Sequence, residues 1–189
     1  MASTGLRRFR YAILNSDRET YSTVKTMAGA ISAAVSLNIP EASLYADDTT
    51  KEYVTGFQSA AITLGIDDDD DTIFAEILGK TIVTESKLVT SSIDDTPPYV
   101  GFGHIVVKLV NNVPLYKVEW FPKVKFKPFI PDANTKGENI EFGTPSVEGM
   151  IIANNAGIWE KHQTLTTETA ANTALDGFFT QPESNQQTA

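Results

Sequence analysis

A strict alternation of side-chain types over residues 116–128 constrains the fold of this chain most. The even positions carry Tyr, Val, Trp, Pro, Val, Phe and Pro, whereas the odd positions carry Lys, Glu, Phe and three further Lys. A period of two residues is typical of a β-strand, so the segment predicts one long strand, or two collinear strands, with an apolar and a basic face. Pro122 and Pro128 have no N–H to donate to a ladder, which places this strand at a sheet edge or at bulges.

Further extended segments surround this strand. Residues 99–110 precede it through Asn111 to Pro114, which predicts a β-hairpin. Residues 31–39 alternate as well, so we expect a half-buried strand ended by Pro40, with its apolar odd positions inward. The outward side chains of this strand are small, namely Ser32, Ala34, Ser36 and Asn38. The other extended segments are residues 9–14, 52–64 with a bulge at Gly56, 139–142, 147–153 and 157–163.

Two helices are expected. Five aspartates, Asp67–Asp71, stand directly before a segment whose apolar side chains fall on one helical face, and Gly79 follows where a helix commonly ends. The aspartates lie at the positive end of this short helix. A second helix is expected from about Thr167 to Phe178. Together these elements predict a mainly β fold, a β-sandwich or open barrel, with one short flanking α-helix and a C-terminal helix.

The length and composition suit a single globular domain. For 189 residues we expect an N-terminal arm over residues 1–8, one β-sandwich domain over 9–179 and a flexible C-terminal tail over 180–189. The net charge of −9 disfavours a protein that grips nucleic-acid phosphates, and the lack of cysteine excludes disulfides, thiolate zinc sites and cysteine nucleophiles. No apolar run suits a signal core or a membrane span, so we expect a soluble protein made in the cytoplasm.

Patterns that would carry catalysis or bind a metal are weak. A calcium loop counted from Asp67 needs glycine at its sixth position and glutamate at its twelfth, but the chain has Thr72 and Leu78 there. The two histidines, His104 and His162, lie in expected strands without a nucleophile motif beside them. We therefore expect no enzyme, no cofactor and no metal. The aspartates are expected to cap the helix, with a weak cation site or a docking patch for a basic partner as the alternatives.

Two other functions stay open on the aromatic and acidic residues. An exposed Trp120 or Trp159 would suit a carbohydrate-binding β-sandwich, and Glu119 or Glu141 would suit a β-jelly-roll hydrolase. Nothing in their spacing brings the two carboxylates together. The simpler interpretation is that the tryptophans are core residues and the glutamates lie on solvent-facing surfaces.

Charge is distributed unevenly along the chain, which favours contacts between copies. Basic and acidic patches on one small chain suit head-to-tail association into rings or filaments. We expect inter-subunit contacts at two basic groups and one acidic group, namely Arg7, Arg8 and Arg10; Lys117, Lys123, Lys125 and Lys127; and Asp67, Asp68, Asp69, Asp70 and Asp71.

Several phrases of the sequence together resemble a known family. They are Met-Ala-Ser-Thr-Gly-Leu-Arg-Arg with Phe-Arg-Tyr at residues 1–11, Ser-Leu-Asn to Ala-Ser-Leu-Tyr-Ala-Asp-Asp at 36–48, Tyr-Val-Thr-Gly-Phe to Ile-Thr-Leu-Gly-Ile-Asp at 53–67, Pro-Pro-Tyr-Val-Gly-Phe-Gly-His at 97–104, Glu-Gly-Met-Ile at 148–151 and Asp-Gly-Phe-Phe at 176–179. In this order the chain resembles the major tail tube proteins of long-tailed, non-contractile bacteriophages (siphoviruses) of Gram-positive hosts. The resemblance covers nearly the whole chain but depends on no single diagnostic motif.

The resemblance implies a structural virion protein. Such proteins have a β-sandwich with a flanking helix, assemble as hexameric rings and stack into a tube around the tape-measure protein. The implied partners are further copies of the chain, the tape-measure protein, the tail-tip or baseplate initiator and the tail terminator. DNA only passes through the lumen, no membrane is involved, and the tube is assembled in the host cytoplasm. An acidic lumen would repel DNA and let it slide.

Overall fold

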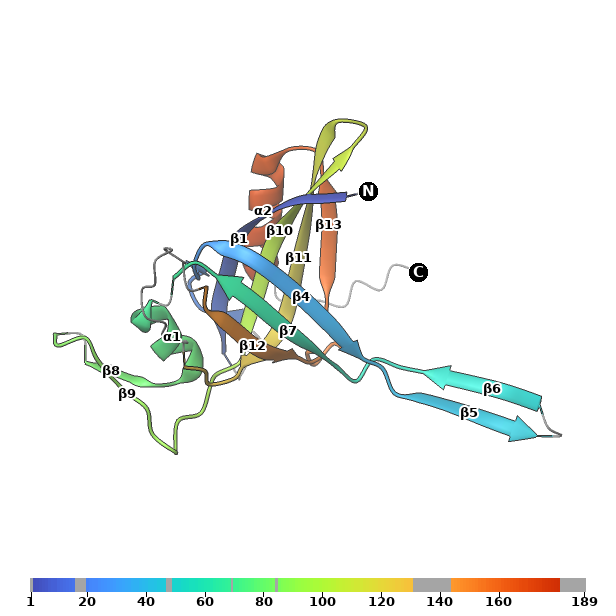
Figure 1. The fold of residues 1–189 in the computed structure, drawn as a ribbon, viewed down its shortest axis with the longest axis horizontal. Helices are drawn as coiled ribbons and strands as arrows, with labels where there is room; N and C mark the ends of the chain where they lie inside the picture. Colours follow the sequence, from blue (N-terminus) through green and yellow to red (C-terminus); the bar gives the residue numbers. More distant parts are fainter. Residues whose placement is uncertain are drawn as a thin grey trace, which may run out of the picture.

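The computed structural model describes residues 2–15, 20–46, 49–68, 70–83, 85–130 and 144–180. A nine-stranded antiparallel sheet dominates these residues (Figure 1). Its strands are β1 (Ala2–Asn15), β2 (Thr20–Tyr21), β3 (Lys25–Thr26), β4 (Ala30–Asn38), β7 (Ser59–Ile66), β10 (Val100–Val110), β11 (Val113–Phe126), β12 (Ser146–Ile151) and β13 (Lys161–Leu165). The order is β2-β1-β10-β11-β12-β7-β4, with β3 also paired to β1 and β13 to β11. The expectation of a mainly β fold is confirmed.

The expected hairpin is the centre of this sheet. Strands β10 and β11 pair in register from Val110 opposite Val113, so the connection is a two-residue turn. Its residues, Asn111 and Asn112, have φ angles of 49° and 62°. Positive φ at both central positions is what a type I′ turn requires, and asparagine tolerates it better than most residues. The two asparagines therefore fix the register of the longest strand pair.

A bulge at Pro122 divides β11 into two halves. Phe102 pairs with Phe121 and Val100 with Val124, so β11 has one residue more than β10 across this step. The extra residue reverses which side of the sheet the alternate positions face. The expectation that prolines mark bulges is confirmed at Pro122.

The reversal corrects the prediction of one apolar and one basic face. Val118 and Trp120 lie in the core beneath the C-terminal helix, whereas Val124 and Phe126 lie in the main core on the opposite side. Lys117 therefore does not share a face with the later lysines. These are Lys123, Lys125 and Lys127, which alternate with the residues of the main core.

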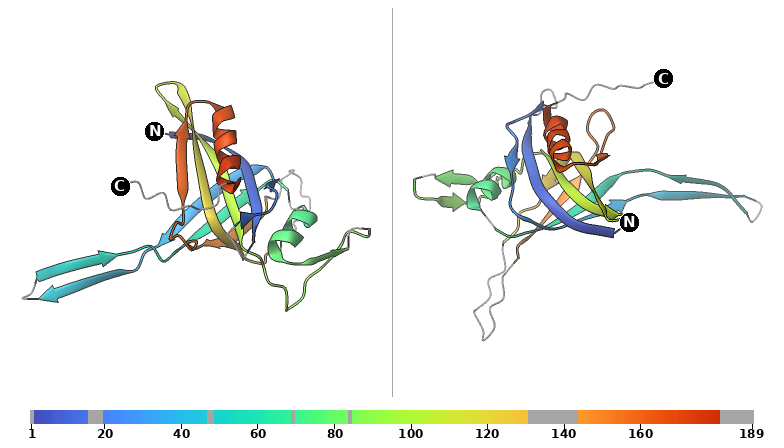
Figure 2. Two further views of the ribbon diagram at one scale, coloured as in Figure 1. Left: turned by 180° about the vertical axis from the view of Figure 1, so that it is seen from behind. Right: turned by 90° about the horizontal axis from the view of Figure 1, so that it is seen from above.

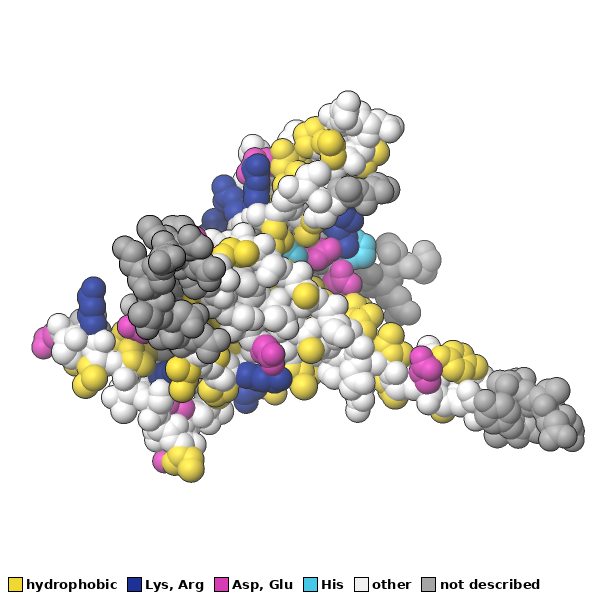
Figure 3. Space-filling view, in the orientation of Figure 1, with side chains coloured by type: hydrophobic (Ala, Val, Ile, Leu, Met, Phe, Trp, Pro, Cys, Tyr) yellow, Lys and Arg dark blue, Asp and Glu magenta, His cyan; other side chains and the backbone are white. Residues whose placement is uncertain are grey.

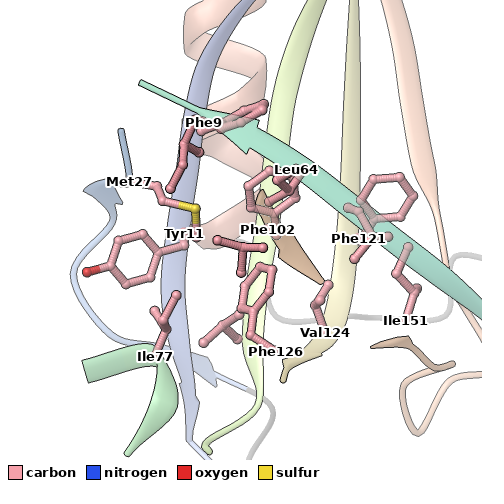
Figure 4. Close-up of a cluster of buried hydrophobic side chains, with 14 of the residues drawn as sticks. Phe9, Tyr11, Met27, Leu64, Ile77, Phe102, Phe121, Val124, Phe126 and Ile151 are labelled. Carbon is pink, nitrogen blue, oxygen red and sulfur yellow. The ribbon is translucent and has the colours of Figure 1, made fainter. Parts of the chain in front are cut away.

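The bulge also lets the sheet turn back over itself. Residues 116–120 of β11 pair with β13, whereas residues 124–126 pair with β12, which leads on to β7 and β4. Strands β12, β7 and β4 consequently cross in front of β1, β10 and β11 (Figures 1 and 2). The main core fills the space between the two halves, and Figure 4 shows Phe9, Phe102 and Phe121 of the first half in one cluster with Leu64 of β7 and Ile151 of β12.

Both expected helices are confirmed. Helix α1 (Asp71–Leu78) begins after the N-cap Asp70, whose side chain accepts a hydrogen bond from the Thr72 N–H. It ends at Gly79, which is left-handed with a φ of 68°. Helix α2 (Glu168–Thr180) covers the face of β10 and β11 opposite the main core, where Ala171, Leu175 and Phe179 are buried against Trp120.

The N-terminal arm expected over residues 1–8 is wrong for residues 2–8. They form the first half of β1 and pair with β10 from Ala2 opposite Leu109 onward. Register shifts between Ser3 and Gly5 and between Arg7 and Arg10 let this strand follow the twist of β10. Small polar residues suggest an arm, but the long β10 offers a full row of ladder groups that pairs them. Residues 181–189 of the expected tail and the strand expected at 139–142 lie outside the described residues.

The extended stretch expected over 52–64 is two strands rather than one. They are β6 (Thr49–Thr55) and β7, and residues 56–58 separate them where a bulge at Gly56 was expected. Strand β6 pairs with β5 (Glu41–Ala46), which the sequence analysis did not identify. A second small hairpin, β8 (Thr81–Val83) and β9 (Leu88–Thr90), follows α1.

Candidate assembly surface

An edge strand with uncovered apolar side chains is the most unusual surface of the described residues. Among the described residues, strand β4 pairs only with β7, opposite the buried Ile62 and Leu64. On that same face Ala33 packs against the main core, but the next two side chains are exposed, Val35 by 37 % and Leu37 by 46 %. The strand expected here is present, but the expected burial of its odd positions is wrong beyond Ala33, because β4 is the last strand of its layer and no described element fully covers Val35 and Leu37. An exposed apolar edge is a site where another chain can add.

The opposite face of β4 carries only small side chains, as expected. Ser32, Ala34 and Ser36 lie beside Gly65, Thr63 and Ala61 of β7, respectively. None of these side chains extends far from the sheet. A second protein surface could approach the backbone closely here.

The β5–β6 hairpin continues this edge away from the body of the protein. Figure 1 shows it as a two-stranded ribbon beyond the end of β4 and β7, and Tyr53 and Val54 of β6 are exposed. Hydrophobic side chains gather where the ribbon leaves the body (Figure 3). A lone two-stranded ribbon is at best marginally stable in water, so a partner surface would stabilise it.

Four of the basic candidates form ion pairs within the chain. These are Arg7 with Glu168 at 2.8 Å, Arg10 with Asp176 at 4.0 Å, Lys117 with Glu119 at 2.6 Å and Lys127 with Glu148 at 3.1 Å. Arg7 and Arg10 thereby connect β1 to α2. These pairs reduce the charge that the four residues can offer to a neighbouring copy.

Three basic candidates have no carboxylate within 4.0 Å among the described residues. Arg8 is exposed at a bulge of β1, where its φ of 56° is left-handed. The ammonium groups of Lys123 and Lys125 lie 4.8 and 5.2 Å from the centre of the Tyr99 ring. Cation–π attraction holds both lysines over one ring and leaves their charge unneutralised.

The aspartate run has two roles within the chain. Asp67 accepts a hydrogen bond of 2.6 Å from the N–H of Gly29, and Asp70 caps α1, as the sequence predicts. Asp68 and Asp71 are exposed, and Asp69 lies outside the described residues. Asp68 and Asp71 are thus the described members of the run that remain for a partner.

The residues considered for sugar binding are placed differently from what that function needs. Trp120 is fully buried, which removes it as an exposed platform, and Trp159 is stacked on Phe57 with ring centres 4.5 Å apart. Glu119 pairs with Lys117 and with His104, which is buried in β10, while His162 lies exposed in β13. Glu141, the other carboxylate considered for a hydrolase, lies outside the described residues.

The contact between His104 and Glu119 was missed, although the sequence contains its signal. A two-residue turn at Asn111 and Asn112 places residues whose numbers sum to 223 opposite each other, and 104 and 119 do. Similarly, the short alternating stretch after Pro40, followed by two aspartates, could have indicated the β5–β6 hairpin.

Among the described residues, no three histidine or acidic side chains gather in a way that could hold a metal ion. Neither described helix is long and apolar enough to cross a membrane. No protein-family model matches the chain, and no curated protein does either.

Proposed function

We propose that this chain is a structural protein that assembles with itself into the tail tube of a bacteriophage. Copies join side by side into hexameric rings, and the rings stack into a tube around the tape-measure protein, through which DNA passes into the host. The tail-tip initiator and the tail terminator bound the tube at its two ends. The protein acts through its surfaces rather than through a reaction.

The observation that carries this proposal is the uncovered apolar edge of β4. A monomeric protein gains nothing from leaving Val35 and Leu37 in water on a strand whose ladder groups are open. At the other side of the sheet, residues 2–7 of β1 pair only with β10 among the described residues, so this stretch also has an open edge. Two open edges on one sheet allow it to continue from copy to copy.

Charge supports association of the same kind. Arg8 lies at the bulge that directly follows the open stretch of β1, whereas Asp68 precedes α1 and Asp71 is its first residue, and none of the three has an ion pair among the described residues. We expect such groups of opposite sign to meet between copies. Changing Asp68 and Asp71 to asparagine should then weaken assembly at low salt and matter little at high salt, where exposed charges are screened.

Negative-stain electron microscopy of the purified protein over a range of concentrations tests the proposal. Rings or hollow tubes of constant diameter are expected, either alone or after addition of tail-tip complex and tape-measure protein. Monomers that persist with those partners present would overturn it.

A further inference from the structure

A groove of about 380 Å³ lies where β10 begins and β11 ends, on the side of the sheet turned away from the main core. Its walls include Pro97, Tyr99, Lys125, Pro128, Met150 and Ile152. Most of this lining is apolar carbon, and Met150 is 46 % exposed. Grooves of this size hold a few side chains and exclude water from them.

One unneutralised cation, Lys125, lines this groove, and a second, Lys123, lies over the Tyr99 ring that lines it. Lys123 and Lys125 both lie over the Tyr99 ring, and neither has a carboxylate within 4.0 Å in the part of the chain that the structure describes. The neighbouring Lys127 is already paired with Glu148. An apolar floor beside two free ammonium groups suits an apolar side chain that is followed closely by a carboxylate.

The chain itself presents such a pair of side chains. Ile93 is 100 % exposed, and Asp94 follows it with no ion pair among the described residues. The turn that displays them is closed on itself: the Ser92 N–H donates to the Asp95 carboxylate at 2.7 Å, and the Asp95 N–H donates to the Ser92 carbonyl at 3.2 Å. An ordered turn loses little conformational entropy when it binds.

The turn does not occupy the groove of its own chain. The Ile93 side chain projects into solvent, and the segment that joins it to the groove is held in place. The Thr96 carbonyl lies so close to Gly79 at the end of α1 that a Cβ there would meet its oxygen. Pro97 and Pro98 then stiffen the approach to Tyr99, because their rings fix φ. The turn of one molecule can therefore fill the groove only of another molecule.

We propose that the groove receives Ile93 and Asp94 of a second copy of this chain. Ile93 fills the apolar floor beside Met150, and the Asp94 carboxylate meets the ammonium groups of Lys123 and Lys125. This contact rests on the proposed self-assembly and names a surface for it that is separate from the β4 edge. Because each molecule carries both the turn with Ile93 and Asp94 and the groove, copies can join through them without any change in fold.

A charge exchange tests the polar half of this contact in the full-length protein. Asp94→Lys and Lys125→Glu should each weaken self-association, measured by sedimentation velocity, by about tenfold or more. The double variant, which restores opposite charges, should return to within about threefold of the wild type. Lys108→Glu, which makes the same change of charge on β10, is the matched control and should have little effect.

Disulfide cross-linking tests where the Ile93 side chain binds. Since the chain has no cysteine, Ile93→Cys mixed with Met150→Cys can form only disulfides between molecules. A heterodimer is expected under mild oxidation. The control mixture replaces Met150→Cys with Val83→Cys, because Val83 is as exposed as Met150 at 46 %, and should yield far less.

The outcomes separate this contact from the proposed function. If the wild type forms rings or tubes while the charge variants associate normally and the Ile93→Cys and Met150→Cys variants do not cross-link, the groove contact is wrong and self-assembly stands. If the Lys125→Glu defect is rescued by Asp68→Lys or Asp71→Lys instead of Asp94→Lys, the aspartate run at the start of α1 is the occupant, and this proposal is overturned. A wild type that stays monomeric even with tail-tip complex and tape-measure protein present, together with cysteine variants that form no cross-link, overturns both.

Discussion

Nε2 of His104 lies 3.2 Å from Oε2 of Glu119, directly across the ladder between β10 and β11. The other carboxylate oxygen of Glu119 lies 2.6 Å from Nζ of Lys117. The hydrogen bond from His104 lowers the pKa of Glu119 most, and Lys117 lowers it further, so the pKa is about 2 although partial burial acts to raise it. The rings of Phe9, Phe102 and Phe121 surround the imidazole, so the Glu119 carboxylate that it contacts lies at the margin of the main core.

The Glu119 carboxylate should make stability depend on acid. Its pKa is lower in the folded protein than the ordinary value of 4.5, so its contribution is complete above pH 4.5 and is lost as the pH falls towards 2. Glu119→Gln should lower the free energy of unfolding by about 1–3 kcal/mol at pH 7 and by much less near pH 2. Urea unfolding at both pH values measures this. Glu148→Gln, which removes an exposed partner of Lys127, should change it by less than about 0.5 kcal/mol, and an equal loss for both variants would contradict the prediction.

Gly103 is needed where α2 meets the sheet. A Cβ at this position would lie 2.5 Å from Leu175 and 3.1 Å from the Glu119 carbonyl, so Gly103→Ala should destabilise the protein by about 1–3 kcal/mol. Gly177 within α2 has open space around it, and alanine there should stabilise the helix by about 0.5–1 kcal/mol. Thermal unfolding of the two variants should therefore shift in opposite directions, and a shared direction would show that α2 is not packed as described.

The exposed row of β4 should matter for assembly and not for folding. Threonine at positions 35 and 37 keeps the β-branched shape of Val35 and reduces the apolar surface, so the free energy of unfolding should change by less than about 0.5 kcal/mol. Light scattering of the assembling protein should show slower and weaker growth. Val83→Thr on β8, where the side chain is also exposed, is the control. A double variant that assembles like the wild type would remove the β4 edge from the proposed contacts.

The Asp70 cap separates the folding role of the aspartate run from its role between copies. Asp70→Ala should destabilise the protein by about 1 kcal/mol because it removes the acceptor for the Thr72 N–H, whereas Asp70→Asn should nearly preserve stability. Asp68→Asn should leave the unfolding midpoint unchanged. Circular dichroism during urea unfolding measures all three variants, and a large loss with Asp68→Asn would mean that this side chain supports the fold.

The sequence was sufficient where local chemistry decides the structure. The cap at Asp70, the left-handed Gly79 and the paired Asn111 and Asn112 are signals read within a few residues, and each lies where it was expected. Failures occurred where a distant element decides. Alternation shows that Val35 and Leu37 share one face of a strand, but only the position of β4 as the last strand leaves that face uncovered.

The lysine row shows the same limit for the candidate surface. A single extra residue at Pro122 changes which side of the sheet Lys123 and Lys125 face, and periodicity alone does not reveal it. Their shared contact with Tyr99 depends on the start of β10, which lies more than twenty residues earlier in the chain. The groove was therefore beyond prediction, although all of its residues are visible in the sequence.

The pairing of β1 with β10 sets the order of events during synthesis on the ribosome. Ala2 can pair with β10 only after Leu109 has emerged from the ribosome, whereas β4 and β7 can pair as soon as residue 66 has emerged. At roughly 5–20 residues per second, the 43 residues from 66 to 109 take roughly 2–9 s. For that time the β4–β7 pair has neither the rest of its core nor a partner, while the open edge of β4 is already present. The nascent chain is thus most prone to premature association before β1 has paired with β10.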